Sequence, residues 1–442
     1  MRILLLSYHL HPDWTAEGLC VAKTARMLVD HGHQVEILTS MANYLAGESL
    51  IPSSGLLAGI RVHRVAAAPN RLPTGFRQLY TFTHRQQRRG GRGGWFWDKS
   101  AAALDIMLGS NVEDYSWARD AGDLAARLWY NHDGVPFDLL YSRLNHFVSH
   151  LAALNVVHQR PHIHWCAHFS DPWPGHLYPT DYRHKPTRSG LMERRQERIL
   201  HTILDRAQSL TFPGDRLCRF LLSGSRERYR HKAHAIPHLG NFWDGRPAYR
   251  QGEQFNLVFA GFLLRQRSTE SLFQGLQQFL TATPQARAAI RMQFIGKNTA
   301  VVEEGVQKYA LAGVVSTAPQ RGFSEVWPLL CQADVLLLIE SPMAEGVFMP
   351  SKLADYLSAG RPILALSPPV GTVADFLSQG GGLRVDPDDA TQIAQALQQL
   401  YALWQSHRLE DLAPAPSLID RVSPACLAPL YDAAFHQALG KE

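Results

Sequence analysis

Short apolar runs alternate with amphipathic segments along most of this 442-residue chain. At its start, RILLLSY is an apolar run of buried-strand length, and QVEILTS is a second such run. Between them, the apolar residues of LCVAKTARMLVDHG recur at helical spacing up to Gly32. A strand, a helix and a strand within this length predict a βαβ unit of a parallel sheet. Ligands bind beyond the carboxyl ends of such strands, so the polar loop at residues 9–18 is a candidate site.

The alternation continues through two series of elements, which a polar stretch containing Gly and Pro separates at residues 241–254. The first series predicts further strands near residues 61–67, 138–142, 162–169, 209–214 and 234–240. The second series predicts strands near residues 256–263, 291–297, 334–341, 361–367 and 381–386. This order predicts an α/β protein with two doubly wound, Rossmann-like domains that face a cleft. We expect the domains to cover residues 1–243 and 244–418, followed by a closing helix within residues 419–442.

The composition is that of a globular protein, with 45% apolar and 19% charged residues. A net charge of +5 is too small for a dedicated nucleic-acid binder but suits a protein that handles anionic small molecules or touches an anionic membrane. The five cysteines are scattered without paired spacing, which argues against a disulfide framework and a zinc knuckle and favours a reducing cytoplasm. No apolar run approaches the roughly 18 residues that span a bilayer.

The stretch EGVFMPSKLADYLSAGRP, from Glu345 to Pro362, has the features of an anion site. Pro350 precedes a helix that Ser351 is expected to cap and that ends at Gly360. The first-turn amides and Lys352 would then present positive charge to a phosphate. Asp355 lies on the same helical face, where it could accept hydrogen bonds from a ribose. The alternative is an ordinary surface helix with a serine cap and a Lys–Asp pair.

This stretch resembles glycosyltransferases of the GT-B fold, specifically those of family 4. Members carry a strand, a Glu-Gly-Phe-Gly-like loop, and a helix with a second glutamate that ends in Ala-Ala-Gly-Lys-Pro. Here Glu345 stands for the first acid, and residues 358–362 match the helix end. The second acid falls on Asp355, and the spacing between the acids is two residues longer than usual. The resemblance implies that Glu345 contacts the donor sugar, Asp355 holds the ribose, and Ser351 and Lys352 bind the diphosphate.

The resemblance extends to further donor-binding positions and to the overall architecture. Gly18, in the loop after the first strand, would lie under the donor phosphates. Gly261 matches a family glycine, and Arg267 stands where a diphosphate-binding lysine is expected. Phe262 replaces the family's arginine, and Arg265 in the same loop could supply that charge. The closing helix would cross back onto the first domain.

Acceptor contacts are expected after the strand at residues 162–169. The Asp-Pro-Trp-Pro element that follows looks like one found in relatives, which makes Asp171 a candidate contact for the acceptor hydroxyl or the donor sugar, with Trp173 beside it. His168 is the second candidate. The alternatives are a turn aspartate and a packed strand histidine. His162, His164 and His168 alternate along the run, but no nearby carboxylate or cysteine completes a metal site, so none is expected.

Residues 76–97 combine five arginines with aromatic residues and glycines. A single short cluster in a nearly balanced chain is weak support for nucleic-acid binding. Arginines beside aromatic residues also suit an anionic membrane surface, so we expect peripheral membrane contact here or contact with a lipid-linked acceptor. The alternative is a solvated loop.

These features and the resemblance together predict a glycosyltransferase without a cofactor, and the resemblance implies that it is retaining and metal-independent. Its donor would be a UDP- or GDP-linked sugar, and its acceptor a glycan or a lipid-linked glycan. The resemblance implies a role in polysaccharide or glycolipid biosynthesis, in the cytoplasm or at the inner face of the membrane. Two alternatives remain: a nucleotide-sugar epimerase, and a non-catalytic relative that binds sugar nucleotides or partner proteins. Phe262 favours the non-catalytic alternative.

Overall fold

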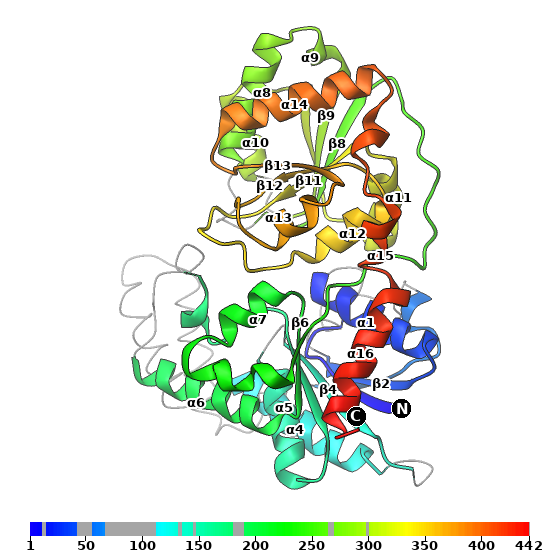
Figure 1. The fold of residues 1–442 in the computed structure, drawn as a ribbon, viewed down its shortest axis with the longest axis vertical. Helices are drawn as coiled ribbons and strands as arrows, with labels where there is room; N and C mark the ends of the chain where they lie inside the picture. Colours follow the sequence, from blue (N-terminus) through cyan, green and yellow to red (C-terminus); the bar gives the residue numbers. More distant parts are fainter. Residues whose placement is uncertain are drawn as a thin grey trace.

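Two parallel sheets, each covered by helices on both faces, form two domains that meet across a junction (Figure 1). A computed structural model describes residues 1–10, 15–41, 55–66, 112–130, 135–144, 147–179, 190–263, 269–297 and 300–441. The basic stretch at residues 76–97 lies outside the described residues.

The first domain contains a seven-stranded parallel sheet with the order β3-β2-β1-β4-β5-β6-β7. Its strands are β1 (Arg2–Leu6), β2 (Gln34–Ser40), β3 (Arg61–Val65), β4 (Leu139–Leu144), β5 (Trp165–Phe169), β6 (Ser209–Phe212) and β7 (Ala233–Ala235). Its helices are α1 (Ala16–Asp30), α4 (Val112–Leu128), α5 (Val148–Gln159), α6 (Gly190–Arg206) and α7 (Asp215–Leu221). Short 3-10 turns cover η1 (Gly55–Leu57), η3 (Gly175–Leu177) and η5 (Gly224–Lys232).

The second domain repeats the same winding in a six-stranded parallel sheet with the order β10-β9-β8-β11-β12-β13. Its strands are β8 (Phe255–Ala260), β9 (Ile290–Ile295), β10 (Val315–Ala318), β11 (Val335–Ile339), β12 (Ile363–Leu366) and β13 (Gly382–Val385). Its helices are α8 (Glu270–Ala282), α9 (Ala286–Ala289), α10 (Ala300–Lys308), α11 (Phe323–Gln332), α12 (Ser351–Ala359), α13 (Thr372–Leu377) and α14 (Ala390–Gln405). The turn η6 (Leu409–Leu412) and the helices α15 (Pro416–Asp420) and α16 (Pro424–Ala438) follow.

Both faces of the central strands are buried, which explains why they read as continuous apolar runs in the sequence. In β1, Ile3 and Leu5 pack into the core beneath α1, whereas Leu4 and Leu6 pack into the core beneath α4 and α5. Successive side chains of a strand point to opposite faces, so one short run supplies two cores. Each such buried side chain contributes roughly 1.5–3 kcal/mol to the free energy of folding.

The last helix, α16, leaves the second domain and packs against the first, as Figure 1 shows. Leu427, Tyr431 and Phe435 belong to the same core as the strand β1. The ring centroid of Tyr141 on β4 lies 6.1 Å from that of Tyr431 and 5.3 Å from that of Phe435. The expected fold class, with two Rossmann-like domains and a closing helix that crosses back, is therefore confirmed.

Several elements differ from the sequence-based expectation at their ends. Helix α1 begins at Ala16, inside the stretch that was expected to be a loop, because Thr15 caps it through the N–H of Gly18. Strand β5 begins at Trp165, so the residues around His162 precede it. The elements α7, β10 and α15 were not anticipated, since runs of four to seven residues carry little periodicity.

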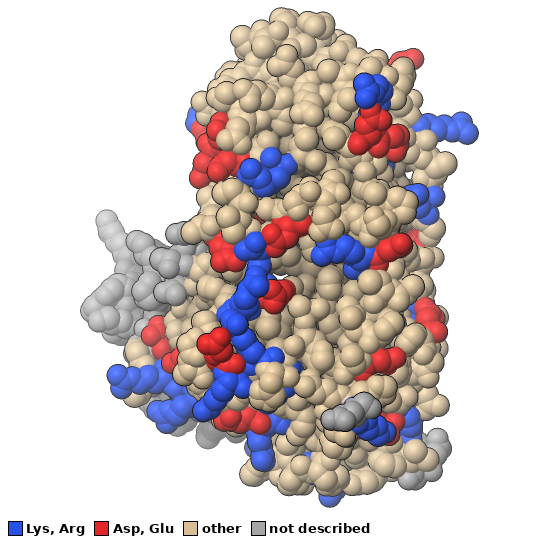
Figure 2. Space-filling model, viewed as in Figure 1, with Lys and Arg blue, Asp and Glu red and all other residues tan. Residues whose placement is uncertain are grey.

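None of the helices in the described part of the chain is long and apolar enough to cross a bilayer. On the face shown in Figure 2, basic side chains run down the first domain with acidic side chains interspersed among them. Charges of both signs are therefore present on this face.

Candidate active site

Two adjoining cavities lie at the domain junction, beyond the carboxyl ends of strands from both sheets. Their volumes are about 260 and 470 Å³. Both are lined by Thr15 and Ala16 at the start of α1 and by Pro350 and Ser351 at the start of α12. In each sheet the winding reverses at the central strands, where ligands of open α/β sheets bind.

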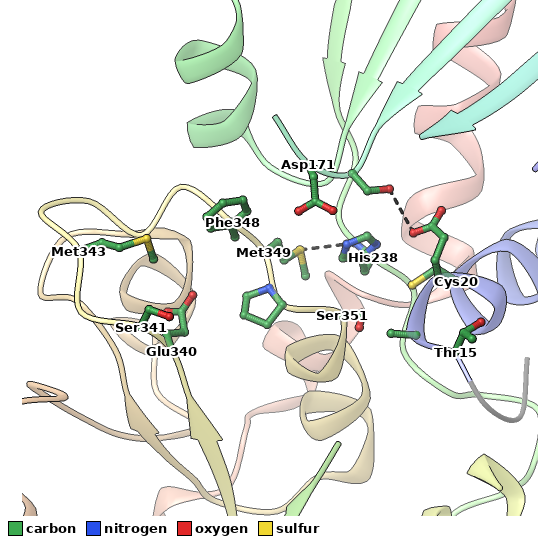
Figure 3. Close-up of a pocket in the computed structure, with 14 residues that line it drawn as sticks. Thr15, Cys20, Asp171, His238, Glu340, Ser341, Met343, Phe348, Met349 and Ser351 are labelled. Carbon is green, nitrogen blue, oxygen red and sulfur yellow. Dashed lines mark hydrogen bonds between the residues drawn. The ribbon is translucent and has the colours of Figure 1, made fainter. Parts of the chain in front are cut away.

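The smaller cavity, here called the acidic cavity, is lined by carboxyl groups from both domains. Glu17 and Asp171 come from the first domain and Glu340 from the second, together with Cys20, Ser170, His238, Ser341, Met343, Phe348 and Met349. Figure 3 shows Asp171 pointing from the end of the first sheet toward the segment that carries Phe348 and Met349. Asp171 therefore lies where the sequence analysis placed it, at the junction and next to a cavity.

The larger cavity, here called the apolar cavity, is bounded mainly by the second domain. Aromatic and aliphatic side chains dominate one side, and two basic residues stand at the ends of strands. Its lining includes Leu19, Gly261, Phe262, Gly296, Lys297, Gln320, Arg321, Phe323, Val326, Leu330, Lys352, Asp355 and Tyr356. A cavity of this volume, with a mostly apolar lining and a few polar groups, is typical of a small-molecule site.

The carboxylate of Glu17 forms an ion pair with the buried side chain of Arg143. The Nε of Arg143 donates to Glu17 Oε1 at 3.1 Å, and the hydroxyl of Ser170 donates to Glu17 Oε2 at 3.1 Å. Burial raises the pKa of Glu17, whereas Arg143 opposes that change. Arg143 also donates to the hydroxyls of Thr24 and Tyr141, so the carboxyl group is fixed in place by a network on β4 and α1.

Two buried histidines differ in their access to the acidic cavity. His238 lines it, and burial lowers the pKa of His238 to about 3, so its ring is neutral. His168 lies inside β5, does not line either cavity, and its Nδ1 is 2.9 Å from the hydroxyl of Thr211. The structure thus favours the alternative interpretation of His168 as a packed strand histidine.

The start of α12 presents its backbone to both cavities. Pro350 occupies the N-cap position and no side chain caps the helix, so the expected cap by Ser351 is wrong: Ser351 is the first helical residue. The N–H of Leu353 bonds to the carbonyl of Pro350 at 2.9 Å. The helix ends at Gly360, which has a left-handed conformation with φ of 69°, as expected from the sequence.

Lys352 lies beside Gly261 at the edge of the apolar cavity. Its ammonium nitrogen is 3.9 Å from the ring centroid of Phe259, a cation–π contact. Gly261 adopts a φ of +134°, and a Cβ there would stand 2.8 Å from the Lys352 nitrogen. The glycine therefore allows the lysine to lie against the end of β8.

Asp355 lines the apolar cavity and is also paired across the junction. Its carboxylate accepts a hydrogen bond from the ammonium of Lys23 on α1, which is itself 3.4 Å from the carbonyl of Leu239. Burial raises the pKa of Asp355, and Lys23 opposes that change. Contact of Asp355 with a ribose stays a prediction, and Lys23 is the partner that the sequence analysis missed.

Glu345 does not line either cavity. Its carboxylate accepts a hydrogen bond of 2.6 Å from Arg216 on α7, and the same guanidinium bonds to Asp375 on α13 at 2.6 and 2.8 Å. The backbone of Gly346 pairs with that of Gly371, which holds the loop beside α13. The described structure therefore brings Glu340, five positions earlier, into the acidic cavity and leaves Glu345 in an interdomain ion pair.

The remaining predicted site residues fall in three groups. Gly18 lies within the first turn of α1, where its N–H donates to the Thr15 hydroxyl at 3.1 Å, and it lines neither cavity. Trp173 stacks on Phe147 with ring centroids 5.0 Å apart and also lines neither cavity. Phe262 lines the apolar cavity. Arg265 and Arg267 lie outside the described residues.

Several lining residues were not singled out by the sequence analysis, among them Glu17, Lys297, Arg321, Glu340 and Ser341. Each follows the rule that ligands meet the carboxyl ends of parallel strands, because they come just after a strand or in the loop and helix start behind one. Applied to every strand, that rule would have found Glu340 and Lys297. Arg321 follows β10, a strand that the sequence analysis did not include.

The described residues contain no cluster of three or more His, Cys, Asp or Glu side chains that could hold a metal ion. All five cysteines are unpaired thiols, and four of them are buried. Carboxyl groups line the smaller cavity, and the side chains of Lys297, Arg321 and Lys352 line the larger one.

Part of the chain matches a family model, and the whole chain is similar in fold to solved structures. Residues 255–402 match the model of the family described as glycosyl transferases group 1. Sucrose-phosphate synthase from Thermosynechococcus elongatus superposes with a TM-score of 0.64 at 16% identity over 100% of this chain and 99% of its own. HepE from Anabaena, solved with UDP-glucose, has a TM-score of 0.61 at 12% identity over 98% of this chain and 99% of its own. The lipopolysaccharide outer core galactosyltransferase WaaB has a TM-score of 0.55 at 11% identity, over 98% and 99% of the two chains.

These matches span both chains almost completely, so this protein has the two-domain GT-B fold of glycosyltransferases. The family match covers most of the second domain and confirms the resemblance seen in the sequence. A comparison of the sequence with curated proteins found no match.

Proposed function

We propose that this protein is a glycosyltransferase that moves a sugar from a nucleotide-diphosphate sugar to an acceptor hydroxyl with retention of configuration. One observation carries the proposal: the start of α12 lines both cavities. A diphosphate at this helix start would leave the nucleoside in the apolar cavity and the sugar in the acidic cavity. The group 1 family match of the second domain and the UDP-glucose named with HepE support this arrangement.

The phosphate site combines a helix start with a full positive charge. A charge-assisted hydrogen bond from Lys352 contributes about 1.5–3 kcal/mol, whereas the helix dipole contributes about 0.3–1 kcal/mol. Lys352 should therefore dominate diphosphate binding, with Ser351 and the first-turn amides adding direction. Arg267 and Arg265, as the resemblance implies, would add further charge from the loop after β8.

The proposed reaction depends on positioning and on stabilisation of the departing diphosphate. The acceptor would attack from the face that the diphosphate leaves, as the resemblance to retaining enzymes implies. Lys352 and the amides of α12 would stabilise the leaving group without a metal. Asp171, at the end of β5, would contact the acceptor hydroxyl or the sugar from the side of the first domain.

We propose that the acceptor is a glycan or a lipid-linked glycan. The enzyme would then act in surface polysaccharide or glycolipid synthesis at the cytoplasmic face of a membrane. The name of WaaB, a lipopolysaccharide galactosyltransferase of the same fold, supports this class. The basic and aromatic composition of residues 76–97 supports contact with anionic lipid.

The test is nucleotide release from a panel of UDP- and GDP-linked sugars with a glycan or lipid-linked acceptor. We expect release with at least one donor, and a loss of about tenfold or more in kcat/KM for Lys352→Ala, the equivalent of 1.4 kcal/mol. The matched control is Lys308→Ala on the surface of α10, which should leave turnover unchanged. Equal turnover of Lys352→Ala and the wild type would contradict the phosphate site.

A second candidate function, a non-catalytic binder of sugar nucleotides, is favoured by Phe262. This residue lines the apolar cavity and is 43% exposed at a position where the family has an arginine. Tight nucleotide binding without release from any donor would support this candidate. Recovery of turnover by Phe262→Arg would then identify the substitution as the cause.

A further inference from the structure

The net positive charge of the chain is concentrated in one part of the first domain. Residues 190–232, which run from α6 to η5, contain ten lysine and arginine residues against five aspartate and glutamate residues. Their net charge of +5 equals that of the whole chain, so the remaining residues together are neutral. On the face shown in Figure 2, basic side chains gather over α6 and α7.

Helix α6 is amphipathic, and its exposed face is basic. On the inner face, Leu200, Ile203 and Leu204 are fully buried in the core of the first domain. Residues three, four and seven positions apart share a face of a helix. One apolar residue and four arginines at such spacings are exposed and form what is here called the arginine face: Leu191, Arg194, Arg195, Arg198 and Arg206.

The acids beside the arginine face are paired, whereas its arginines are not. Asp205 lies 3.6 Å from Arg228, and Glu197 lies 3.3 Å from Arg226, so two basic residues of η5 offset these two acids. The arginines of the arginine face form no ion pair with any residue that the structure describes. None of them lines either junction cavity, so the proposed phosphate site does not use their charge.

The direction of α6 places the arginine face toward the junction. Strand β6 begins at Ser209, three residues after α6 ends, so the helix ends at the amino edge of the sheet and begins toward the carboxyl edge. That edge carries Asp171, which follows β5 and lines the acidic cavity. Because Arg194, Arg195 and Arg198 belong to the first half of α6, they lie on the half nearer to the cavity.

We propose that the arginine face of α6 docks on an anionic lipid bilayer. The argument is charge complementarity: a bilayer of this kind presents a plane of phosphate groups, and each arginine close to it strengthens binding. The arginines form a row along a helix, which suits an extended charged surface better than a single bound anion. Leu191, with 65% of its surface exposed, stands at the start of the row, where it can enter the headgroup layer.

This inference rests on the proposed function for its purpose, since docking through α6 would bring a lipid-linked acceptor to the side of the junction that carries Asp171. The binding itself does not depend on sugar transfer. It can therefore be measured without a donor or an acceptor.

Co-sedimentation of the full-length protein with vesicles tests the binding. One set of vesicles contains phosphatidylglycerol and phosphatidylcholine in equal parts, and the other contains phosphatidylcholine alone. We expect binding to the mixed vesicles only, and its loss at about 1 M salt, where the Debye length falls to about 3 Å. Equal binding to both kinds of vesicle, or binding to neither, would overturn the proposal.

A triple variant assigns the binding to the arginine face. Replacement of Arg194, Arg195 and Arg198 by Gln should lower the partition coefficient for the mixed vesicles about a hundredfold. The matched control replaces three exposed arginines of the second domain by Gln: Arg250, Arg287 and Arg408. It changes the net charge equally and should retain binding within about twofold, because those side chains lie on another domain. Equal losses in the two triple variants would show that binding follows net charge and not the arginine face.

Leu191→Gln separates a bilayer from a soluble polyanion. Loss of the inserted apolar side chain should weaken vesicle binding about tenfold and leave binding to a soluble polyanion such as dextran sulfate unchanged. An unchanged affinity for vesicles would contradict insertion of Leu191. Thermal unfolding midpoints equal to that of the wild type verify that each variant is folded.

The remaining outcomes assign the charge elsewhere or separate this inference from the proposed function. Binding of a single-stranded oligonucleotide without binding of vesicles would replace the bilayer by nucleic acid. Loss of vesicle binding on replacement of Arg88, Arg89 and Arg92 by Gln, with none in the α6 variant, would assign the contact to residues 76–97. Both results would overturn the inference. Vesicle binding without sugar transfer from any donor would overturn the proposed function alone.

Discussion

The ammonium group of Lys23 on α1 and the carboxylate of Asp355 on α12 form a buried ion pair across the domain junction. The side chains are 1% and 8% exposed, and the ring of Phe323 lies 4.9 Å from the lysine nitrogen. The pair joins the two helices whose starts line both cavities. It therefore couples the relative position of the domains to the geometry of the proposed diphosphate site.

Removal of one partner of this ion pair should destabilise the protein strongly. Lys23→Met leaves the carboxylate of Asp355 buried without its partner, which costs about 3–5 kcal/mol. Chemical denaturation followed by circular dichroism and tryptophan fluorescence measures the change in unfolding free energy.

The double variant Lys23→Met with Asp355→Leu is the matched control for this prediction. It replaces the pair by apolar side chains and should recover most of the lost stability, because it leaves no buried charge. If the double variant instead loses as much unfolding free energy as the two single variants together, the two residues do not interact.

Loss of the contact between Arg216 and Glu345 should lower activity and change stability little. The carboxylates of Glu345 and Asp375 are 47% and 52% exposed, so loss of the contact should change the unfolding free energy by less than about 1 kcal/mol. Arg216→Ala and Glu345→Gln should lower kcat/KM by similar factors, and the double variant should be no worse than either. A much larger loss in Glu345→Gln than in Arg216→Ala would show that Glu345 acts directly on the sugar.

Gly261→Ala should weaken nucleotide binding. The backbone at this position has a φ of +134°, which strains any residue with a Cβ, and the new methyl group would stand 2.8 Å from the Lys352 nitrogen. Displacement of the ammonium group should reduce the affinity for a nucleotide diphosphate about tenfold, by calorimetry. Gly313→Ala is the control, because Gly313 has a φ of +78° but no atom within 4 Å of its added Cβ. An equal loss of nucleotide affinity in Gly261→Ala and Gly313→Ala would show that the effect does not depend on Lys352.

Stability should fall as the pH falls from 7.5 to 5.5. Burial lowers the pKa of His150 and of His238 to about 3, whereas both titrate near 6.5 in the unfolded chain. Between these values the unfolded state binds more protons, so the free energy of unfolding rises with pH. Each histidine should account for about 1.4 kcal/mol over this range.

The pH prediction is checked by urea denaturation at a series of pH values. His150→Gln should reduce the dependence by about 1.4 kcal/mol, because it removes one of the histidines whose pKa is lowered by burial. An identical pH dependence in His150→Gln and the wild type would show that His150 is not buried in its neutral form.

The strands and helices around the site could be predicted because their signals are local. The apolar run of β1, the helical spacing of α1 and the left-handed glycine at Gly360 each depend on a few neighbouring residues. The first residue of a helix was harder to predict where a side-chain cap sets it, as Thr15 does for α1. The helix start that was expected to bind an anion lines the junction cavities, but the expected cap by Ser351 was wrong, since Pro350 occupies the N-cap position.

The sequence by itself determined the order of most strands and helices and the two-domain fold, because continuous apolar runs and apolar residues at helical spacing depend on neighbouring positions. Only the tertiary structure decided which acids reach the cavities. Asp355 meets Lys23 across 332 positions, and Gly346 pairs with Gly371, so that Glu340 lines the acidic cavity while Glu345 meets Arg216 outside it. Such contacts depend on how two separately wound domains pack together, and no local pattern records that packing.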